Sequence, residues 1–203
     1  MSKNFLHVGC GTLTKEHTTP EFNSPNWDEI RVDIDESVNP DIVSSMIDMS
    51  SIESNSFDAV YSSHNIEHLF AHEVPLALNE MSRVLKNDGF LIITCPDLQS
   101  VCGEVANGRL VETLYQSGMG PISALDILYG FRPSLQKGNH YMAHNVGFTK
   151  DVLQATLINS GFKSAVVASI ASRYVLWAIA TKNKAEDTNI LFDMLKKHST
   201  LLS

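Results

Sequence analysis

The chain has 203 residues, 43% of them hydrophobic and 19% charged, which suits a single globular domain. Its 23 acidic and 15 basic residues give a formal net charge of -8. No cluster of Lys and Arg is present to hold a nucleic-acid backbone, so we expect no nucleic-acid partner. No apolar stretch is long enough to span a membrane, and three cysteines without metal-type spacing favour a reducing, cytoplasmic setting. We therefore expect no membrane partner.

The first predicted element is a short buried strand at 5–8, which runs into the sequence Gly-Cys-Gly at 9–11. Glycine adopts positive φ and carries no Cβ, so backbone N–H groups at such a turn can approach a ligand closely. Residues 12–26 include two prolines and are predicted to form a loop. A second strand at 29–34 carries Asp33 near its end, where a carboxylate can accept hydrogen bonds from two ribose hydroxyls. This pairing indicates a nucleotide-type ligand.

The middle of the chain continues the alternation of strands and helices. A short third strand is predicted within 40–46 and a clearer one at 57–61. Apolar residues at three- and four-residue steps predict a helix over 73–86, which we expect Asn-Asp-Gly at 87–89 to end. The apolar run at 90–95 is typical of a parallel strand that is covered on both faces.

The second half of the chain contains a segment of a different kind. Residues 98–147 hold seven glycines and are predicted to form an irregular insertion. Thr149 is predicted to cap a helix over 149–160. Two strands, at 162–170 and 174–181, then follow as an antiparallel hairpin.

The chain is predicted to end in a helix with Thr188 or Asn189 as its N-cap. Its apolar residues are expected to pack against the rest of the protein, and a homodimer contact there stays open. Alternating strands and helices, closed by a hairpin, predict an α/β fold with a doubly wound sheet. In such a sheet ligands bind at the carboxyl ends of the strands. Gly9, Asp33 and His64 lie at or directly after strand ends and should converge there.

The sequence His-Asn-Ile-Glu-His at 64–68 offers a competing interpretation, because it matches the inverted zinc-protease motif. Two histidines four residues apart share one helix face and can bind zinc, with Glu67 as the base. That motif needs a long helix, whereas here it directly follows a predicted strand. We therefore expect no metal and keep a zinc hydrolase as an alternative.

A nicotinamide-dependent oxidoreductase is a further alternative for a glycine turn that follows a strand. It is disfavoured because the third glycine of its fingerprint is not at the expected place. No Tyr-x-x-x-Lys pair occurs either.

Taken together, the order and spacing of these segments resemble the class I S-adenosylmethionine-dependent methyltransferases, in their small type 11-like branch. The resemblance implies a Rossmann-like seven-stranded sheet that is mostly parallel with an antiparallel last strand. It also implies one methyltransferase domain over 1–203, in which the insertion at 98–147 covers the substrate. The matching segments are 6–11, 27–35, 48–49, 57–69, 80–89 and 147–162.

The same resemblance implies S-adenosyl-L-methionine as the cofactor and a set of residues that bind it. The acceptor is then expected to be an oxygen or nitrogen of a small molecule or sugar, with a cofactor-binding module that performs no turnover as the alternative. The implied binding residues are Gly9 and Gly11 with Cys10 between them at the methionine end, Asp33 with Ile34 beside it at the ribose, Asp48 and the Met49 backbone at the adenine, and Ser63 near the sulfonium.

Methyl transfer asks little covalent chemistry of the protein, because the sulfonium of the cofactor is already activated. The protein must align the acceptor with the methyl group and exclude water, and an oxygen acceptor also needs a base. His64 is the first candidate for that base, with a purely structural role as its alternative. We expect His140 and His144 to lie in a solvated loop, and Cys10 to be an inert packing residue.

Overall fold

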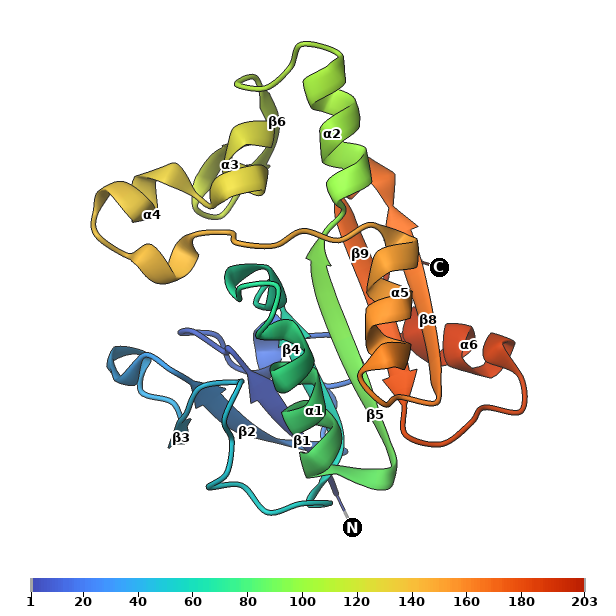
Figure 1. The fold of residues 1–203 in the computed structure, drawn as a ribbon. Coiled ribbons are helices and arrows are strands. Elements are labelled where there is room, and N and C mark those ends of the chain that lie inside the picture. Colours follow the sequence, from blue (N-terminus) through green and yellow to red (C-terminus); the bar gives the residue numbers. More distant parts are fainter. Residues whose placement is uncertain (1, 203) are drawn as a thin grey trace.

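The computed structural model describes residues 2–202, and its largest unit is a seven-stranded sheet in the order β3-β2-β1-β4-β5-β9-β8 (Figure 1). β9 is antiparallel to both of its neighbours, while the pairs from β3 to β5 are parallel. This confirms the predicted fold class. The strands are β1 (Lys3–Val8), β2 (Trp27–Asp33), β3 (Ile42–Val43), β4 (Phe57–Ser63), β5 (Leu85–Pro96), β8 (Ser164–Ile170) and β9 (Val175–Thr181).

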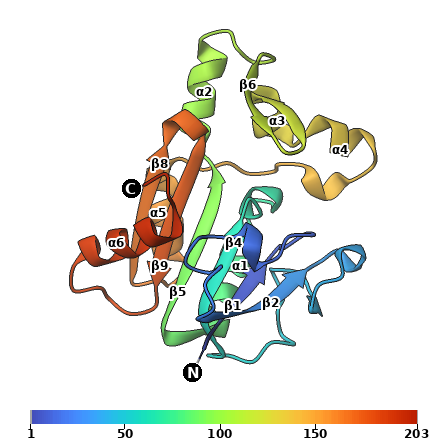
Figure 2. The ribbon, with the colours of Figure 1, turned by 180° about the vertical axis from the view of Figure 1, so that it is seen from behind.

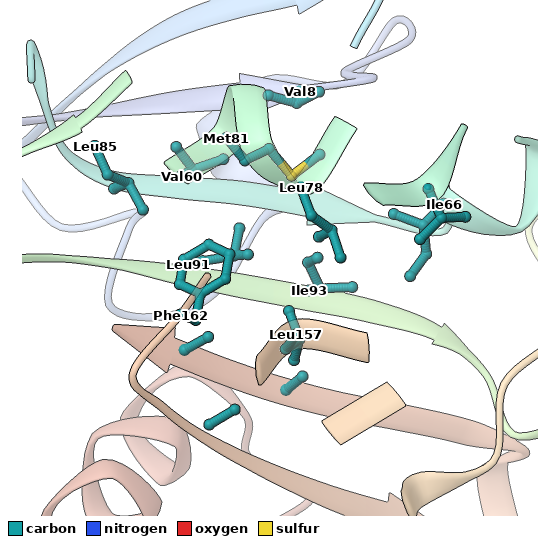
Figure 3. Close-up of a cluster of buried hydrophobic side chains, with 14 of the residues drawn as sticks. Val8, Val60, Ile66, Leu78, Met81, Leu85, Leu91, Ile93, Leu157 and Phe162 are labelled. Atoms are coloured by element: carbon teal, nitrogen blue, oxygen red, sulfur yellow. The ribbon is translucent and has the colours of Figure 1, made fainter. Parts of the chain in front are cut away.

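Two helices cover one face of the sheet, α1 (Val74–Val84) and α5 (Lys150–Asn159) (Figure 1). Figure 3 shows how their apolar side chains meet those of the strands, with Leu78 of α1 and Leu157 of α5 near Ile93 of β5. All three side chains are fully buried. Thr149 caps α5 by accepting a hydrogen bond from the Val152 N–H, as predicted.

The opposite face is covered by the loop between β1 and β2 together with the terminal helix α6 (Thr188–His198) (Figure 2). Phe22 of the loop stacks on Phe5 of β1, with ring centroids 4.3 Å apart, and is fully buried. Leu191 and Leu195 of α6 complete this second core. The predicted loop and the predicted packing of the last helix are both confirmed.

The predicted end of α1 and the predicted N-cap of α6 were wrong. α1 ends at Val84, because Leu85 already pairs with Phe57 of β4 as the first residue of β5. The register then shifts, so that Asn-Asp-Gly at 87–89 lies in an irregular part of the strand instead of ending a helix. The N-cap of α6 is Asp187, whose carboxylate accepts a hydrogen bond from the Asn189 N–H, rather than Thr188 or Asn189.

The insertion after β5 contains more regular structure than predicted and stands at the carboxyl edge of the sheet (Figure 1). Its α3 begins in a capping box, in which Ser123 and Asp126 exchange hydrogen bonds between side chain and backbone. Arg132 pairs with the same Asp126 carboxylate at 2.7 Å. Its elements are α2 (Leu98–Ala106), β6 (Thr113–Ser117), β7 (Gly120–Ser123), α3 (Ala124–Tyr129) and α4 (Arg132–Gln136).

Among the described residues, none of the helices combines the length and the apolar character needed to cross a membrane.

Candidate active site

The glycine turn after β1 lies next to the end of β2, because the two strands are parallel neighbours. Gly9 and Gly11 adopt φ values of 67° and 54°, a region that favours glycine. The N–H groups of Gly9 and Cys10 both donate to the Val32 carbonyl, at 2.8 and 3.2 Å. The turn is thereby fastened to the strand that carries Asp33.

The Asp33 carboxylate faces this turn. Its Oδ2 accepts a hydrogen bond from the Gly11 N–H at 2.7 Å, and its Oδ1 accepts one from the Asp35 N–H at 2.9 Å. Ile34 follows with its side chain half exposed. The structure therefore brings together the glycine turn and the strand-end carboxylate that the sequence singled out.

Arg31 stabilises the turn from β2 and was missed by the sequence analysis. Its guanidinium donates to the carbonyls of Gly11 at 2.8 Å and Leu13 at 3.0 Å, and also to that of Asn39 at 3.0 Å. Burial raises the pKa of the Cys10 thiol to about 11, although the nearby Arg31 opposes this rise. Cys10 is therefore a protonated thiol at neutral pH, as expected of a packing residue.

Asn65 is the second residue that the sequence analysis missed. Its side-chain amide donates to the carbonyls of Gly9 and Ser63, at 3.2 and 2.8 Å, and so joins the ends of β1 and β4. A Cβ atom at position 9 would overlap this amide. Position 9 thus requires glycine both for its backbone angle and for the space that Asn65 fills.

The two residues expected at the adenine lie in the loop after β3. Asp48 is exposed, and its carboxylate accepts a hydrogen bond from the Ser50 N–H at 3.1 Å. The Met49 N–H donates to Glu80 at 2.7 Å, and the Met49 carbonyl accepts from Arg83 at 2.7 Å and from the Ile52 N–H at 2.8 Å. The Met49 backbone groups are therefore used within the protein, which does not fit the expected contact with adenine.

Ser63 is the last residue of β4, and His64 follows it directly. The Ser63 hydroxyl is bonded to the Thr94 hydroxyl at 2.7 Å, and the His64 N–H donates to the Thr94 carbonyl at 2.9 Å. His64 has a positive φ of 54°, and its side chain is 52% exposed. Its Nδ1 lies 3.3 Å from Oε1 of Glu67, close enough for an ion pair when the ring is protonated.

The His-Asn-Ile-Glu-His segment forms a 3₁₀ turn at Ile66–His68 and not the long helix of a zinc protease. Glu67 is buried, with 1% of its surface exposed. Burial raises the pKa of this carboxyl, but the imidazoles of His64 and His68 outweigh that effect and hold it below its usual value. Glu67 is thus a carboxyl group in the protein interior beside two imidazoles.

A cavity of about 230 Å³ lies between this turn and the insertion. Most of its wall is apolar, with polar groups from Glu67, His144 and Asn145. His144 is partly buried rather than solvated as expected, and burial lowers its pKa, so the ring is neutral at neutral pH. The lining residues are Glu67, Pro96, Leu98, Val101, Ile127, Leu128, Tyr129, His144, Asn145, Val146, Gly147 and Phe148.

Comparison with known proteins indicates a family for the part of the chain that forms this edge. The family model described as a methyltransferase domain matches residues 6–93, which include the glycine turn, Asp33 and the end of β4. This match supports the class I S-adenosylmethionine-dependent methyltransferases as the family that the sequence resembles. It indicates methyl transfer from S-adenosyl-L-methionine as the reaction and favours it over the hydrolase and oxidoreductase alternatives. No curated protein matches the chain.

Solved structures share the fold of this chain at low sequence identity. A Pyrococcus horikoshii protein is 15% identical with a TM-score of 0.60, and the match covers 90% of this chain and 83% of the other. A Methanosarcina mazei S-adenosylmethionine-dependent methyltransferase is 15% identical with a TM-score of 0.59, covering 91% and 94%. One from Archaeoglobus fulgidus is 16% identical with a TM-score of 0.55, covering 88% and 86%.

The protein thus has two adjoining regions at the carboxyl edge of its sheet. One is the glycine turn with Asp33, and the other is the cavity under the insertion. In the described part of the chain, none of the cavity-lining residues comes from the glycine turn or from β2. β4 lies between β1 and β5 in the sheet, and the segment that follows it holds both His64 and the cavity-lining Glu67.

Proposed function

We propose that the enzyme methylates an oxygen or nitrogen of a small molecule or sugar that binds in the cavity under the insertion. The observation that carries this proposal is the cavity itself, which borders Glu67 at the end of β4 and is roofed by α3 and the segment around His144. A volume of about 230 Å³ suits a small acceptor and lies below the range typical of drug-sized ligands. The net charge of -8 also argues against a polyanionic acceptor.

In this proposal the cofactor lies along the carboxyl ends of β1, β2 and β4. Gly9, Cys10 and Gly11 border its methionine end, and the Asp33 carboxylate, with Ile34 beside it, binds the ribose. Asp48 binds the adenine amino group through its exposed carboxylate. We assign no contact to the Met49 backbone, because its polar groups are already bonded within the protein.

Ser63 and His64 then lie beside the sulfonium and the acceptor. His64 is the proposed base, since its ring is half exposed and its Nδ1 lies 3.3 Å from the buried Glu67 carboxylate. This leaves Nε2 to accept the proton of an acceptor hydroxyl. An amine acceptor that arrives neutral needs no such base.

An assay of S-adenosylhomocysteine release tests this proposal with a panel of small alcohols, phenols, amines and sugars. We expect release that depends on one acceptor class, and we expect Leu128→Trp, which fills the cavity, to raise the KM for that acceptor more than tenfold. Leu125→Trp is the matched control, because Leu125 lies on the same helix but does not line the cavity. Equal effects of the two variants, or release without any acceptor dependence, would refute the assignment of the cavity.

A further inference from the structure

A cluster of potential metal ligands lies at the wall of the cavity. The ligand-type atoms of Glu67, His68 and His144 all lie within 4.8 Å of one another. Two of these residues belong to the turn after β4, and the third comes from the end of the insertion. We propose that these three side chains bind one divalent transition-metal ion, with Zn²⁺ as the fitting example.

The Glu67 carboxylate is the first observation that points to a ligand. It is 1% exposed, and neither of its oxygens has a hydrogen-bond partner in the described chain. Its neighbour His64 is close enough for an ion pair, but that ring is half exposed to water. A buried carboxylate without hydrogen bonds is costly, and a bound cation removes that cost.

The two histidines are the second, independent observation. Nδ1 of His68 lies 3.0 Å from the Ala143 carbonyl, and Nδ1 of His144 lies 2.7 Å from the Ile127 carbonyl. A carbonyl only accepts hydrogen bonds, so in both rings Nδ1 carries the proton and donates it. Nε2 therefore keeps its lone pair, which is the arrangement that backbone carbonyls impose on metal-binding histidines.

The spacing of the donor atoms also fits a metal ion. Zinc bonds of about 2.1 Å place tetrahedral donors about 3.4 Å apart. The donor atoms lie no more than 4.8 Å apart, so side-chain movements of up to about 1 Å reach that spacing, and the three ligands come from a turn and a loop, which permit such movements. Two imidazoles and one carboxylate form a ligand set that suits Zn²⁺ and Fe²⁺.

Three protein ligands leave at least one coordination position open, as in catalytic metal sites. Glu67 and His144 both line the cavity, so the open position faces the space assigned to the acceptor. The next step rests on the proposed function: the cation binds an oxygen of the acceptor and lowers the pKa of its hydroxyl. This proposed metal site departs from the sequence-based expectation of no metal.

Cobalt titration of the chelator-treated protein tests the site without any activity measurement. Co²⁺ bound to nitrogen and oxygen ligands absorbs visible light, and Zn²⁺ should displace it. We expect saturation at one equivalent per chain, with at least tenfold weaker binding in Glu67→Gln and His144→Ala. Glu67→Gln preserves the shape of the side chain and removes a buried charge, so its fold should hold.

The matched controls are His72→Ala and His140→Ala, since both residues are exposed histidines outside the cluster. Both variants should bind cobalt like the unmodified protein. Binding of S-adenosylhomocysteine to the same samples separates this test from that of the proposed function. The proposal is overturned if cobalt does not saturate below millimolar concentration, or if Glu67→Gln and His144→Ala bind it as well as the controls.

Discussion

At the scale of single residues, the two strand-end features singled out by the sequence, the glycine turn and Asp33, do meet in the structure. The sequence pattern was enough to predict that they lie close together, because parallel strands bring their carboxyl ends to one edge of the sheet. Arg31 and Asn65 were not found, since their roles depend on carbonyls from distant segments that no spacing reveals. His144 joins Glu67 and His68 only because the insertion folds back over the turn.

Gly9 provides the sharpest single-residue prediction. Gly9→Ala places a side chain at positive φ, which costs about 1–2 kcal/mol, and also displaces the Asn65 amide. Gly11→Ala has the same backbone cost but meets no atom within 4 Å. We expect thermal unfolding to show a fall in Tm of about 2–8 °C for Gly11→Ala and a clearly larger one for Gly9→Ala. Equal falls would show that Asn65 imposes no constraint.

At the scale of elements, most strands and the closing hairpin could be predicted from their apolar runs, and α5 from its Thr149 cap and the glycine at position 161. The end of α1 could not, since it is set by the pairing of Leu85 with Phe57, a contact between distant segments. The amount of regular structure in the insertion was underestimated for a different reason. Its capping box of Ser123 and Asp126 has the recognisable pattern Ser-x-x-Asp. The many glycines around this pattern led to the prediction of an irregular segment.

The loop before β2 covers its face of the sheet mainly through Phe22, which predicts a large effect of one substitution. Phe22→Ala should lower the free energy of unfolding by about 3–5 kcal/mol, because it leaves a cavity against Phe5 and Trp27. Phe70→Ala is the control, as Phe70 is 55% exposed. Urea unfolding measures both variants, and losses within about 1 kcal/mol of each other would argue against this role of the loop.

At the scale of the whole molecule, the terminal helix is joined to the loop that follows the glycine turn. His198 of α6 is 3% exposed, and its Nδ1 is bonded to the Thr19 hydroxyl at 2.9 Å. Burial lowers the pKa of His198 from 6.5 to about 4; nearby Glu21 opposes this shift and Lys197 adds to it. The contact between α6 and this loop thus depends on a neutral His198 imidazole.

This contact predicts a dependence of stability on pH. Between pH 6.5 and about 4 the unfolded chain binds a proton at His198 and the folded chain does not, so acid lowers the free energy of unfolding. His198→Phe keeps a ring beside Phe22 and Phe90 and removes this titration. As the pH falls over that range, we expect the free energy of unfolding of the variant to rise by about 2–3 kcal/mol relative to that of the unmodified protein. Urea unfolding at each pH measures this difference. A difference that does not change with pH would contradict the buried neutral state.

Calorimetric titration with S-adenosylhomocysteine tests most directly that the carboxyl edge of this sheet is a methyltransferase cofactor site. We predict one ligand per chain and at least tenfold weaker binding in Asp33→Ala. Binding should be unchanged in Asp35→Ala, because the Asp35 side chain accepts a hydrogen bond from the Ser37 N–H rather than from the glycine turn. The bound ligand should also raise Tm. Absence of binding at millimolar ligand, or equal binding by the two variants, would contradict the cofactor site described above.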